Sequence, residues 1–361
     1  YDLTVANKLT IFSDATLSSG TGNNNIYSYG DIYINPGGTY APGTNTTAYN
    51  GFGNFFLWND GAITNGLYNL EVNKVEGSLI LVSSGNSFTI RNDLRIMSGT
   101  LADGGKIVYV NGNVINNGIH VGAGKISLNK SSGNQSISGN GLGIFQNLEL
   151  FNTFGASGSA PIALASDITL TGRLILANDR LFNLNKYQLT LNTLATIEGS
   201  MSGNRFILTS GKPSDGGLRR IYSDTTAFTF PVGSGSNYTP ATIHIRKIPD
   251  AYGSVTVKPV PTKHPFTTNT TCLPYYWKIE ESGFEGIKET SVGLIFNYGN
   301  LTDNAAYVPG KYIPATWVYL ADVSLVNETS NLITFPAENG FTGDYTAGIP
   351  DAFGIVTSFY S

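Results

Sequence analysis

The sequence is poor in the residues that carry chemistry or form cross-links. Its 361 residues include one cysteine, Cys272, which excludes an intramolecular disulfide and a cysteine-rich zinc site. Charged residues make up only 13% of the chain, and the net charge of −4 argues against a nucleic-acid partner. No apolar run reaches transmembrane length. Cys272 is therefore expected to be a small residue in a buried or half-buried place.

Catalytic and metal-binding motifs are also missing. The three histidines, His120, His244 and His264, are scattered, and none stands at metal-ligand spacing from another ligand type. There is no G-x-S-x-G nucleophile motif, no glycine-rich loop that opens a helix, and no D-x-D-x-D calcium loop. We therefore expect no catalytic residues, no bound metal and no cofactor, with the histidines in structural or surface positions.

Paired carboxylates need separate consideration, because parallel β-solenoids often carry polysaccharide lyases and hydrolases. Two acids one turn of a solenoid apart would lie close enough for glycoside chemistry. Glu71 and Asp93 are 22 residues apart, and Glu149 and Asp167 are 18 apart, so neither pair matches a clean repeat. The sequence thus predicts a protein that is not an enzyme.

Short alternating runs separated by turn residues are abundant instead. In the stretch 67–124, runs such as Leu79–Val82 and Ile107–Val110 alternate with a period of two, and Gly, Asn, Ser and Asp follow every eight to thirteen residues. A helical period is absent from this stretch. The pattern is typical of an all-β protein.

Phrases of the sequence recur at long spacing. Residues 68–73 (YNLEVN) return as 146–151 (QNLELF), an offset of 78, and residues 1–7 look like a further copy. Residues 88–96 are similarly echoed by 168–176. Such repeats indicate stacked units that bury one another's apolar faces, here about three rungs of roughly 26 residues each. We predict a right-handed parallel β-solenoid whose inward-facing residues include Leu70, Leu94, Leu148 and Leu174.

The sequence pattern changes near Arg205, where the alternating runs become longer. About eight such strands separated by Pro and Gly predict an antiparallel, Ig-like β-sandwich with Trp277 and Trp317 on its inner faces. Since 361 residues exceed one usual core, we expect two domains and a short terminal segment. These are a solenoid at 1–204, the sandwich at 205–350, and a linker or start of a next module at 351–361.

The segment 41–58 is rich in both turn residues and aromatic residues. We predict an aromatic loop here, with the candidate ligand-binding residues Tyr49, Phe52, Phe55, Phe56 and Trp58. These rings could form a sugar-stacking platform, or they could pack as a cap on the flank of the solenoid, as buried aromatics usually do.

Several phrases carry a family resemblance. They are YNLEVNK (68–74), SGTL (98–101), FPVGSGSNYTP (230–240), YYWKIEESG (275–283) and the closing segment 340–348. The chain resembles the adhesin-like surface proteins of the Bacteroidota that are built from β-strand repeats. The resemblance implies export by the type nine secretion system and an extracellular place on the surface of a Gram-negative cell. It also implies partners in the secretion machinery and among outer-membrane surface components, and roles such as adhesion or gliding motility. The phrase Asp224-Thr225-Thr226 resembles the O-glycosylation motif of those bacteria, with Thr225 as the modified residue.

Two functions follow as expectations. The first is a non-enzymatic extracellular structural or adhesive segment of a large secreted protein, from which the sequence looks cut at both ends. Its partner would be a polysaccharide or another surface. The alternative is a carbohydrate-active enzyme or carbohydrate-binding module on a β-helix scaffold. A charged groove on one solenoid face would favour the alternative, and aromatic residues packed away from solvent would favour the structural segment.

Overall fold

The fold was analysed in a computed structural model of the chain. The structure describes all residues except 269, 288–291, 300–305, 315, 321, 336–339 and 355–361. Most of the predicted terminal linker, from residue 355 onward, therefore lies outside the described residues. The chain divides into two compact units, which we describe separately: unit 1 comprises 1–182 and 194–200, and unit 2 comprises 183–193 and 201–361. Within the described part of the chain, no helix has the length and apolar character needed to cross a bilayer.

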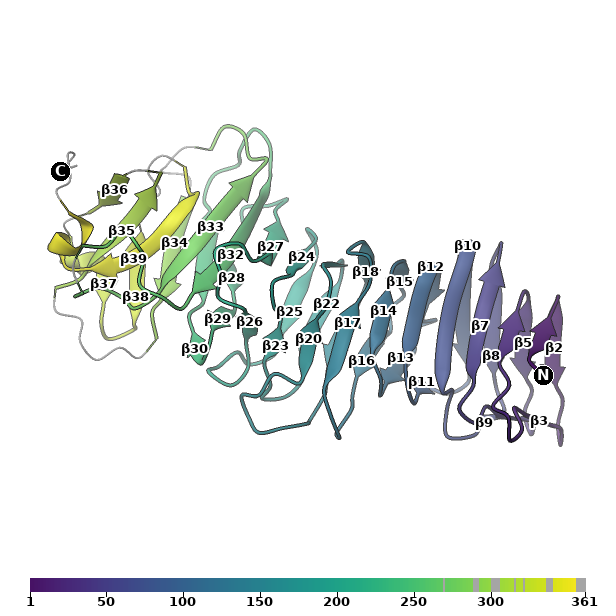
Figure 1. Cartoon of the computed structure of the whole chain (residues 1–361). Helices are drawn as coiled ribbons and strands as arrows, with labels where there is room; N and C mark the ends of the chain where they lie inside the picture. Colours follow the sequence, from purple (N-terminus) through teal and green to yellow (C-terminus); the bar gives the residue numbers. More distant parts are fainter. Residues whose placement is uncertain are drawn as a thin grey trace. The chain divides into compact units, whose positions relative to one another are not determined.

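Unit 1 is the predicted parallel β-solenoid. Each complete turn, here called a coil, contributes up to three strands, and each strand pairs in parallel with its equivalents in the coils before and after it (Figure 1). The strands thus form three ladders. The first ladder contains β1 (Leu3–Val5), β4 (Ile26–Ser28), β7 (Thr46–Gly51), the first part of β10 (Asn69–Ser83), the first part of β12 (Leu94–Ala102), β14 (Val114–Asn116), β17 (Gln135–Ser138) and β20 (Ile162–Leu164).

The second and third ladders complete each coil. The second contains β2 (Lys8–Ile11), β5 (Asp31–Ile34), β8 (Phe55–Asn59), the last parts of β10 and β12, β15 (Ile119–Val121), β18 (Gly143–Phe145) and β21 (Ile168–Leu170). The third begins as β3 (Thr16–Ser18), β6 (Thr39–Ala41) and β9 (Ala62–Ile63). It continues as β11 (Ser87–Ile90), β13 (Ile107–Val110), β16 (Lys125–Leu128), β19 (Leu148–Leu150), β22 (Arg173–Leu176) and β25 (Thr196–Glu198).

Columns of apolar side chains fill the interior of unit 1. Leu70 pairs with Leu94 on the first ladder, and Leu148 pairs with Leu174 on the third. All four side chains are fully buried, which confirms their predicted inward orientation. On most strands inward and outward residues alternate, so buried apolar residues stack on buried partners in the next coil, and the hydrophobic contact continues along the solenoid.

The predicted repeat of 78 residues does not correspond to a structural period. Leu70 lies on the first ladder, whereas Leu148, 78 residues later, lies on the third. Successive partners on the first ladder, from Leu70 through Leu94, Val114 and Ile137 to Leu164, are 24, 20, 23 and 27 residues apart. Because the loops vary in length, the coils differ in length. The two similar sequence segments are therefore strands with the same pattern of alternation that lie on different ladders.

The predicted aromatic loop at 41–58 is also wrong. This segment contains β7 and β8, which are ordinary strands of the first and second ladders. Tyr49 and Leu57 point inward and are almost fully buried. The turn signals that suggested a loop are Gly51 and Gly53, both at positive φ, which form the corner between the two strands.

Unit 2 begins with two further parallel pairings and then changes to antiparallel sheets. β24 (Gln188–Leu191) pairs in parallel with β27 (Gly217–Ile221), and β26 (Ile207–Thr209) pairs in parallel with β29 (Val232–Ser234). Parallel pairing therefore continues beyond residue 204, where the sequence placed the boundary. One antiparallel sheet runs from β27 through β32 (Ser254–Val260), β33 (Tyr276–Ser282), β39 (Gly343–Gly348) and β35 (Val308–Ile313) to β36 (Thr316–Tyr319). A second contains β28 (Phe228–Phe230), β31 (Ala241–Ile245), β34 (Val292–Asn297), β38 (Leu332–Phe335) and β37 (Val326–Asn327).

Aromatic side chains join the two antiparallel sheets as a sandwich. The indole ring of Trp277, from the first sheet, lies 5.2 Å from the ring of Phe296 and 6.1 Å from that of Phe335, both from the second. Trp277 is fully buried, and Trp317 packs against Val308 and Phe353, so both tryptophans lie in the core as predicted. The described part of the chain thus confirms a solenoid and a β-sandwich.

Candidate functional site

Four exposed apolar side chains line one corner of unit 1. They are Tyr29, Phe52, Val75 and Met97, with exposed fractions of 48%, 67%, 69% and 38%. They are 23, 23 and 22 residues apart, which is one coil in each case. Neighbouring coils are about 4.8 Å apart, so the four side chains form a row of roughly 14 Å. We call this row the apolar corner. Large contiguous patches of exposed apolar surface are uncommon in soluble proteins, and the largest patch on a monomer is often a contact site.

Glycines set the path of the chain at this corner. Gly77 and Gly99 have φ angles of 90° and 75°, and a side chain on Gly77 would meet the Gly53 carbonyl carbon and oxygen within 2.5 Å. The pairing of β10 with β12 shifts register at this point, between Val72 and Ser78. The backbones of successive coils therefore lie close together, and the side chains of the apolar corner are turned outward.

Lys74 lies beneath the apolar corner and is fully buried. Its ammonium group donates hydrogen bonds to the carbonyl oxygens of Asn50, at 3.2 Å, and Phe52, at 3.4 Å. The same nitrogen lies 3.1 Å from the centre of the Phe55 ring, a cation–π contact. Burial lowers the pKa of Lys74 from 10.5 to about 8. Lys74 thus ties the loop that carries Phe52 to the next coil.

The outward side of the second ladder carries a second group of apolar side chains. Tyr33, Phe56, Trp58, Ile80 and Val82 alternate with inward residues such as Leu57 and Leu79. We call these five residues the aromatic face. They follow the apolar corner closely along the chain, because Phe56 is four residues after Phe52 and Tyr33 is four after Tyr29. In an extended strand four residues span at most about 13 Å.

Some rings of the aromatic face pack against each other and against neighbouring polar side chains. Tyr33 and Trp58 stack with their centres 5.9 Å apart and their planes at 19°, and the Lys8 ammonium lies 4.1 Å from the Tyr33 ring centre. The Trp58 indole N–H donates a hydrogen bond of 2.5 Å to Asp60. The ring face of Tyr33 is therefore covered, whereas the phenyl ring of Phe52, with two thirds of its surface exposed, is accessible to a ligand.

The five aromatic residues that the sequence predicted to bind a ligand lie in different environments. Tyr49 is buried in the solenoid interior, and Phe55 is half-buried against Lys74. Phe52, Phe56 and Trp58 lie on the outer surface. Sequence reasoning missed the other residues of the surface, namely Tyr29, Tyr33, Val75, Ile80, Val82 and Met97. The apolar residues at one-coil spacing were the signal that could have found the apolar corner.

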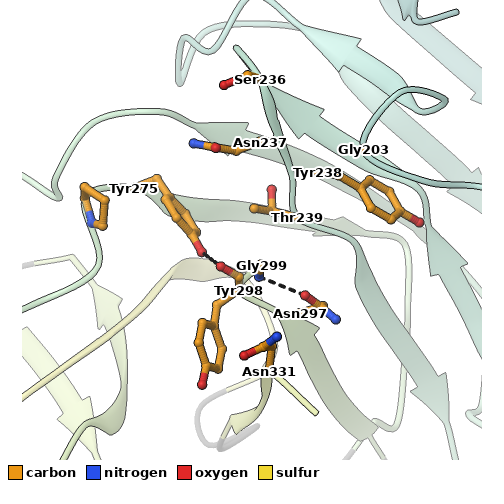
Figure 2. A pocket seen from close by; sticks show the side chains of 11 residues that line it. Gly203, Ser236, Asn237, Tyr238, Thr239, Tyr275, Asn297, Tyr298, Gly299 and Asn331 are labelled. Atoms are coloured by element: carbon orange, nitrogen blue, oxygen red, sulfur yellow. Dashed lines mark hydrogen bonds between the residues drawn. The ribbon is translucent and has the colours of Figure 1, made fainter. Parts of the chain in front are cut away.

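Unit 2 contains a pocket of about 390 Å³. In Figure 2, the side chain of Thr239 lies between the rings of Tyr275 and Tyr238, with Asn237 above it and Asn297 below. The Tyr275 hydroxyl donates a hydrogen bond to the Tyr298 carbonyl oxygen. Burial raises the pKa of Tyr275 far above its ordinary value, so its hydroxyl is protonated throughout the physiological range.

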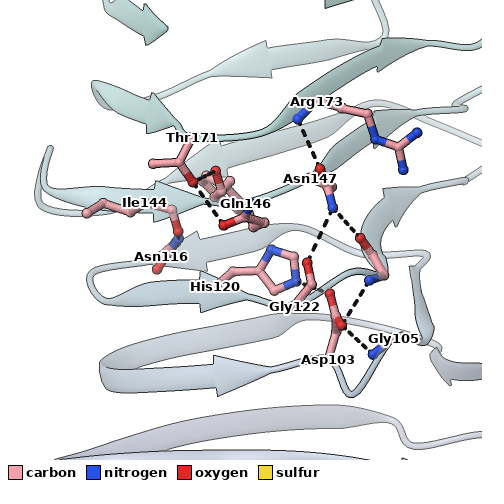
Figure 3. Close-up of polar contacts among 12 residues, drawn as sticks. Asp103, Gly105, Asn116, His120, Gly122, Ile144, Gln146, Asn147, Thr171 and Arg173 are labelled. Atoms are coloured by element: carbon pink, nitrogen blue, oxygen red, sulfur yellow. Dashed lines mark hydrogen bonds and ion pairs between the residues drawn. The ribbon is translucent and has the colours of Figure 1, made fainter. Parts of the chain in front are cut away.

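Two of the three histidines are buried beside an aspartate. His120 Nε2 lies 3.0 Å from Asp103 Oδ2, and both side chains are fully buried in unit 1 (Figure 3). Asp103 also accepts hydrogen bonds from the backbone N–H groups of Gly105 and Gly124. His264 makes the equivalent contact with Asp344, at 3.2 Å, in unit 2. His120 and His264 are therefore buried structural residues, and His244 lies on the surface.

The candidate carboxylate pairs are engaged in ion pairs or separated. Arg95 lies between Glu71 and Asp93, with nitrogen–oxygen distances of 4.0 and 3.2 Å. Glu149, on the third ladder, accepts hydrogen bonds from Lys125 and Ser127 in the preceding coil. Asp167 precedes β21 on the second ladder, so it does not share a ladder with Glu149.

The other singled-out residues occupy ordinary structural environments. Cys272 is buried, as expected, and its sulfur lies 3.8 Å from the Thr267 hydroxyl. Thr225 is half-buried between exposed Asp224 and Thr226, in the segment that joins β27 to β28. No group of three potential metal ligands occurs among the residues that the structure describes.

The fold comprises a β-solenoid and a β-sandwich, with the apolar corner and the aromatic face on the outer surface of the solenoid. No family model matches the chain, and neither a curated protein nor a solved structure is significantly similar to it.

Proposed function

We propose that the chain is a non-enzymatic structural and adhesive segment of a large secreted protein of a Gram-negative cell surface. Its adhesive part is the apolar corner together with the aromatic face, and its ligand is a polysaccharide. The observation that carries the proposal is the exposure of Phe52 and Val75, each about two thirds accessible, in a row repeated on consecutive coils. Such a row costs solubility and contributes nothing to the buried core, so a contact function explains it best.

The structural part of the proposal is supported by the continuity of the ladders. Eight strands of the first ladder pair in sequence, from β1 to β20. Seven steps of about 4.8 Å give a reach of roughly 34 Å in unit 1. Each step is held by backbone hydrogen bonds and by stacked apolar residues, which is how a repeat protein gains length without a larger core.

The polar residues around the apolar corner favour a sugar polymer as the ligand. Asn73 accepts a hydrogen bond from the Ser98 hydroxyl, and Asn54 accepts one from the Ser78 backbone N–H. Amide and hydroxyl groups therefore flank exposed apolar side chains. A polysaccharide offers the complementary combination, because its rings have apolar faces and hydroxyl edges. An extended polymer can also contact several coils at once, and this multiplies weak contacts.

A binding role without catalysis is supported by the environment of the acids. The carboxylates of Glu71, Asp93 and Glu149 face basic side chains in ion pairs or hydrogen bonds. These carboxylates are held against neighbouring side chains, so they are not positioned to transfer a proton to a bound polymer.

Secretion and surface location rest on the resemblance of the repeat phrases to surface proteins of the Bacteroidota. On this basis we propose export by the type nine secretion system, contact with outer-membrane surface components and a role in adhesion or gliding motility. The segment around Thr225 has two exposed flanking residues and could accept a glycan there. Mass spectrometry of the chain isolated from its natural host tests the modification: a hexose-containing adduct on Thr225 supports it, and an unmodified peptide contradicts it.

Binding is tested by depletion of the chain from solution onto insoluble chitin and cellulose. We expect saturable retention on at least one of them, and a loss of at least tenfold in affinity for the double variant Phe52→Ser with Trp58→Ser. Phe151→Ser is the matched control, because Phe151 is 45% exposed and follows β19 on the third ladder, away from the apolar corner. Equal retention of both variants, or no retention of the wild type, contradicts the proposed adhesive surface.

A further inference from the structure

We propose that the pocket of unit 2 binds a single uncharged sugar residue. The inference rests on the lining of this pocket and is independent of the adhesive surface on unit 1. The residues that line it are Gly203, Ser236, Asn237, Tyr238, Thr239, Pro274, Tyr275, Asn297, Tyr298, Gly299 and Asn331. Its volume of about 390 Å³ lies within the range of small-molecule sites.

Hydrogen-bonding groups without protein partners point to a polar ligand. Thr239 is 2% exposed, and its buried hydroxyl has no hydrogen-bond partner within the described part of the chain. Tyr298 is equally buried, and its hydroxyl also lacks a partner there. A buried hydroxyl without a partner costs free energy, so protein interiors usually satisfy it. A ligand hydroxyl in the pocket would satisfy Thr239.

Amide groups add donors at defined positions. The Asn297 side-chain oxygen accepts a hydrogen bond of 2.8 Å from the Gly299 backbone N–H, which fixes the amide and leaves its NH₂ group to donate. Asn237 projects into the same space from β30 (Asn237–Tyr238), beside Thr239 (Figure 2). Amide and hydroxyl side chains can each donate and accept, which suits the mixed donor and acceptor character of sugar hydroxyls.

The uncharged lining of the pocket favours an uncharged ligand over an ionic one. None of the residues that line the pocket is charged, among those that the structure describes. Burial raises the pKa of Tyr238, Tyr275 and Tyr298, so the phenols stay neutral. An anionic or cationic ligand would lose its hydration here without gaining an opposite charge. The rings of Tyr238 and Tyr275, on either side of Thr239 in Figure 2, offer apolar contact for the ring of a sugar.

Titration calorimetry of the full chain with glucose, galactose, mannose and N-acetylglucosamine tests the inference. We expect at least one of them to bind saturably, and glucuronic acid to bind at least tenfold more weakly than the best neutral sugar. Thr239→Val keeps the shape of the side chain and removes the hydroxyl. It should weaken binding about fivefold to tenfold, the effect of one lost hydrogen bond.

Controls separate a binding role from a structural one. Thr239→Val should leave the thermal melt unchanged or slightly raised, because it removes an unpartnered buried hydroxyl. Thr229→Val changes an exposed threonine whose hydroxyl bonds Thr242, so sugar binding should not change. Phe52→Ser should also retain sugar binding, even if it abolishes adhesion to polysaccharide. Absence of binding for all four sugars, or equal affinity of wild type and Thr239→Val, overturns the proposal.

Discussion

Replacing Lys74 by methionine should remove a pH dependence from the stability of unit 1. Lys74 is fully buried and contacts two carbonyl oxygens and the Phe55 ring, and no carboxylate pairs with it among the described residues. Its pKa is lowered from 10.5 to about 8 by burial. Methionine has similar length and no charge, so it can fill the same space.

The magnitude follows from proton linkage. Below pH 8 Lys74 is protonated in both the folded and the unfolded state, and the full cost of burying its charge opposes folding. Between pH 8 and 10.5 only the unfolded state holds the proton, so the free energy of unfolding rises with pH. A pKa difference of about 2.5 then gives a gain of about 2 kcal/mol from pH 7 to pH 9.5. Above pH 10 buried tyrosines such as Tyr40, whose pKa is raised by burial, act in the opposite direction.

Urea unfolding at pH 7 and pH 9.5, followed by far-ultraviolet circular dichroism, measures the effect. The wild type should gain about 2 kcal/mol more than Lys74→Met between the two values of pH, because the other titrating groups are common to both. Lys106→Met, at a lysine that is not buried, should behave as the wild type does. An equal pH response in Lys74→Met and the wild type would refute the assignment of a buried, charged Lys74 at the corner.

Two further predictions concern the core and the division of the chain. Leu94→Asp places an unpaired charge in the solenoid interior and should destabilise unit 1 by several kcal/mol. Met97→Asp, at an exposed site, should have little effect. Equal thermal melts of the two variants would contradict the inward orientation of Leu94. Limited proteolysis should cut first at 200–204, where the two units meet along the chain and 202–204 are exposed. Resistance of this segment, with cleavage elsewhere, would argue against separable units.

Much of the fold could be predicted from the alternation of the sequence. Leu70, Leu94 and Trp277 were assigned to the interior because a period of two places them on one face, and all three are fully buried. The sequence analysis made no prediction for Lys74. Its position in the alternation, in step with Leu70 and Val72, favours the interior, whereas its charge favours the surface. The carbonyl groups of the preceding coil explain its burial.

Other features depend on contacts that a single strand does not reveal. β35 contains Pro309 and Gly310, residues that usually argue against a strand, yet it pairs on both sides with β36 and β39. The segment 41–58 looked like a loop because its glycines form a corner. The apolar corner was missed because its members, Tyr29 and Val75 among them, are three-dimensional neighbours only once the length of each coil is known. Likewise, the pocket of unit 2 brings together Asn237 and Asn297, whose spacing in the sequence carries no signal.

The central claim is that the apolar corner and the aromatic face of unit 1 bind polysaccharide and that the chain does no chemistry on it. One experiment tests both parts: the chain is incubated with the insoluble polymer, chitin or cellulose, that retains it, and the bound fraction and the soluble reducing ends are measured over time. We predict that the bound fraction reaches a plateau and that no reducing ends are released. The affinity of the Phe52→Ser, Trp58→Ser double variant should be at least tenfold lower. Reducing ends that increase with the amount of chain, and that vanish in Glu149→Gln or Asp167→Asn, would contradict the claim and show an enzyme.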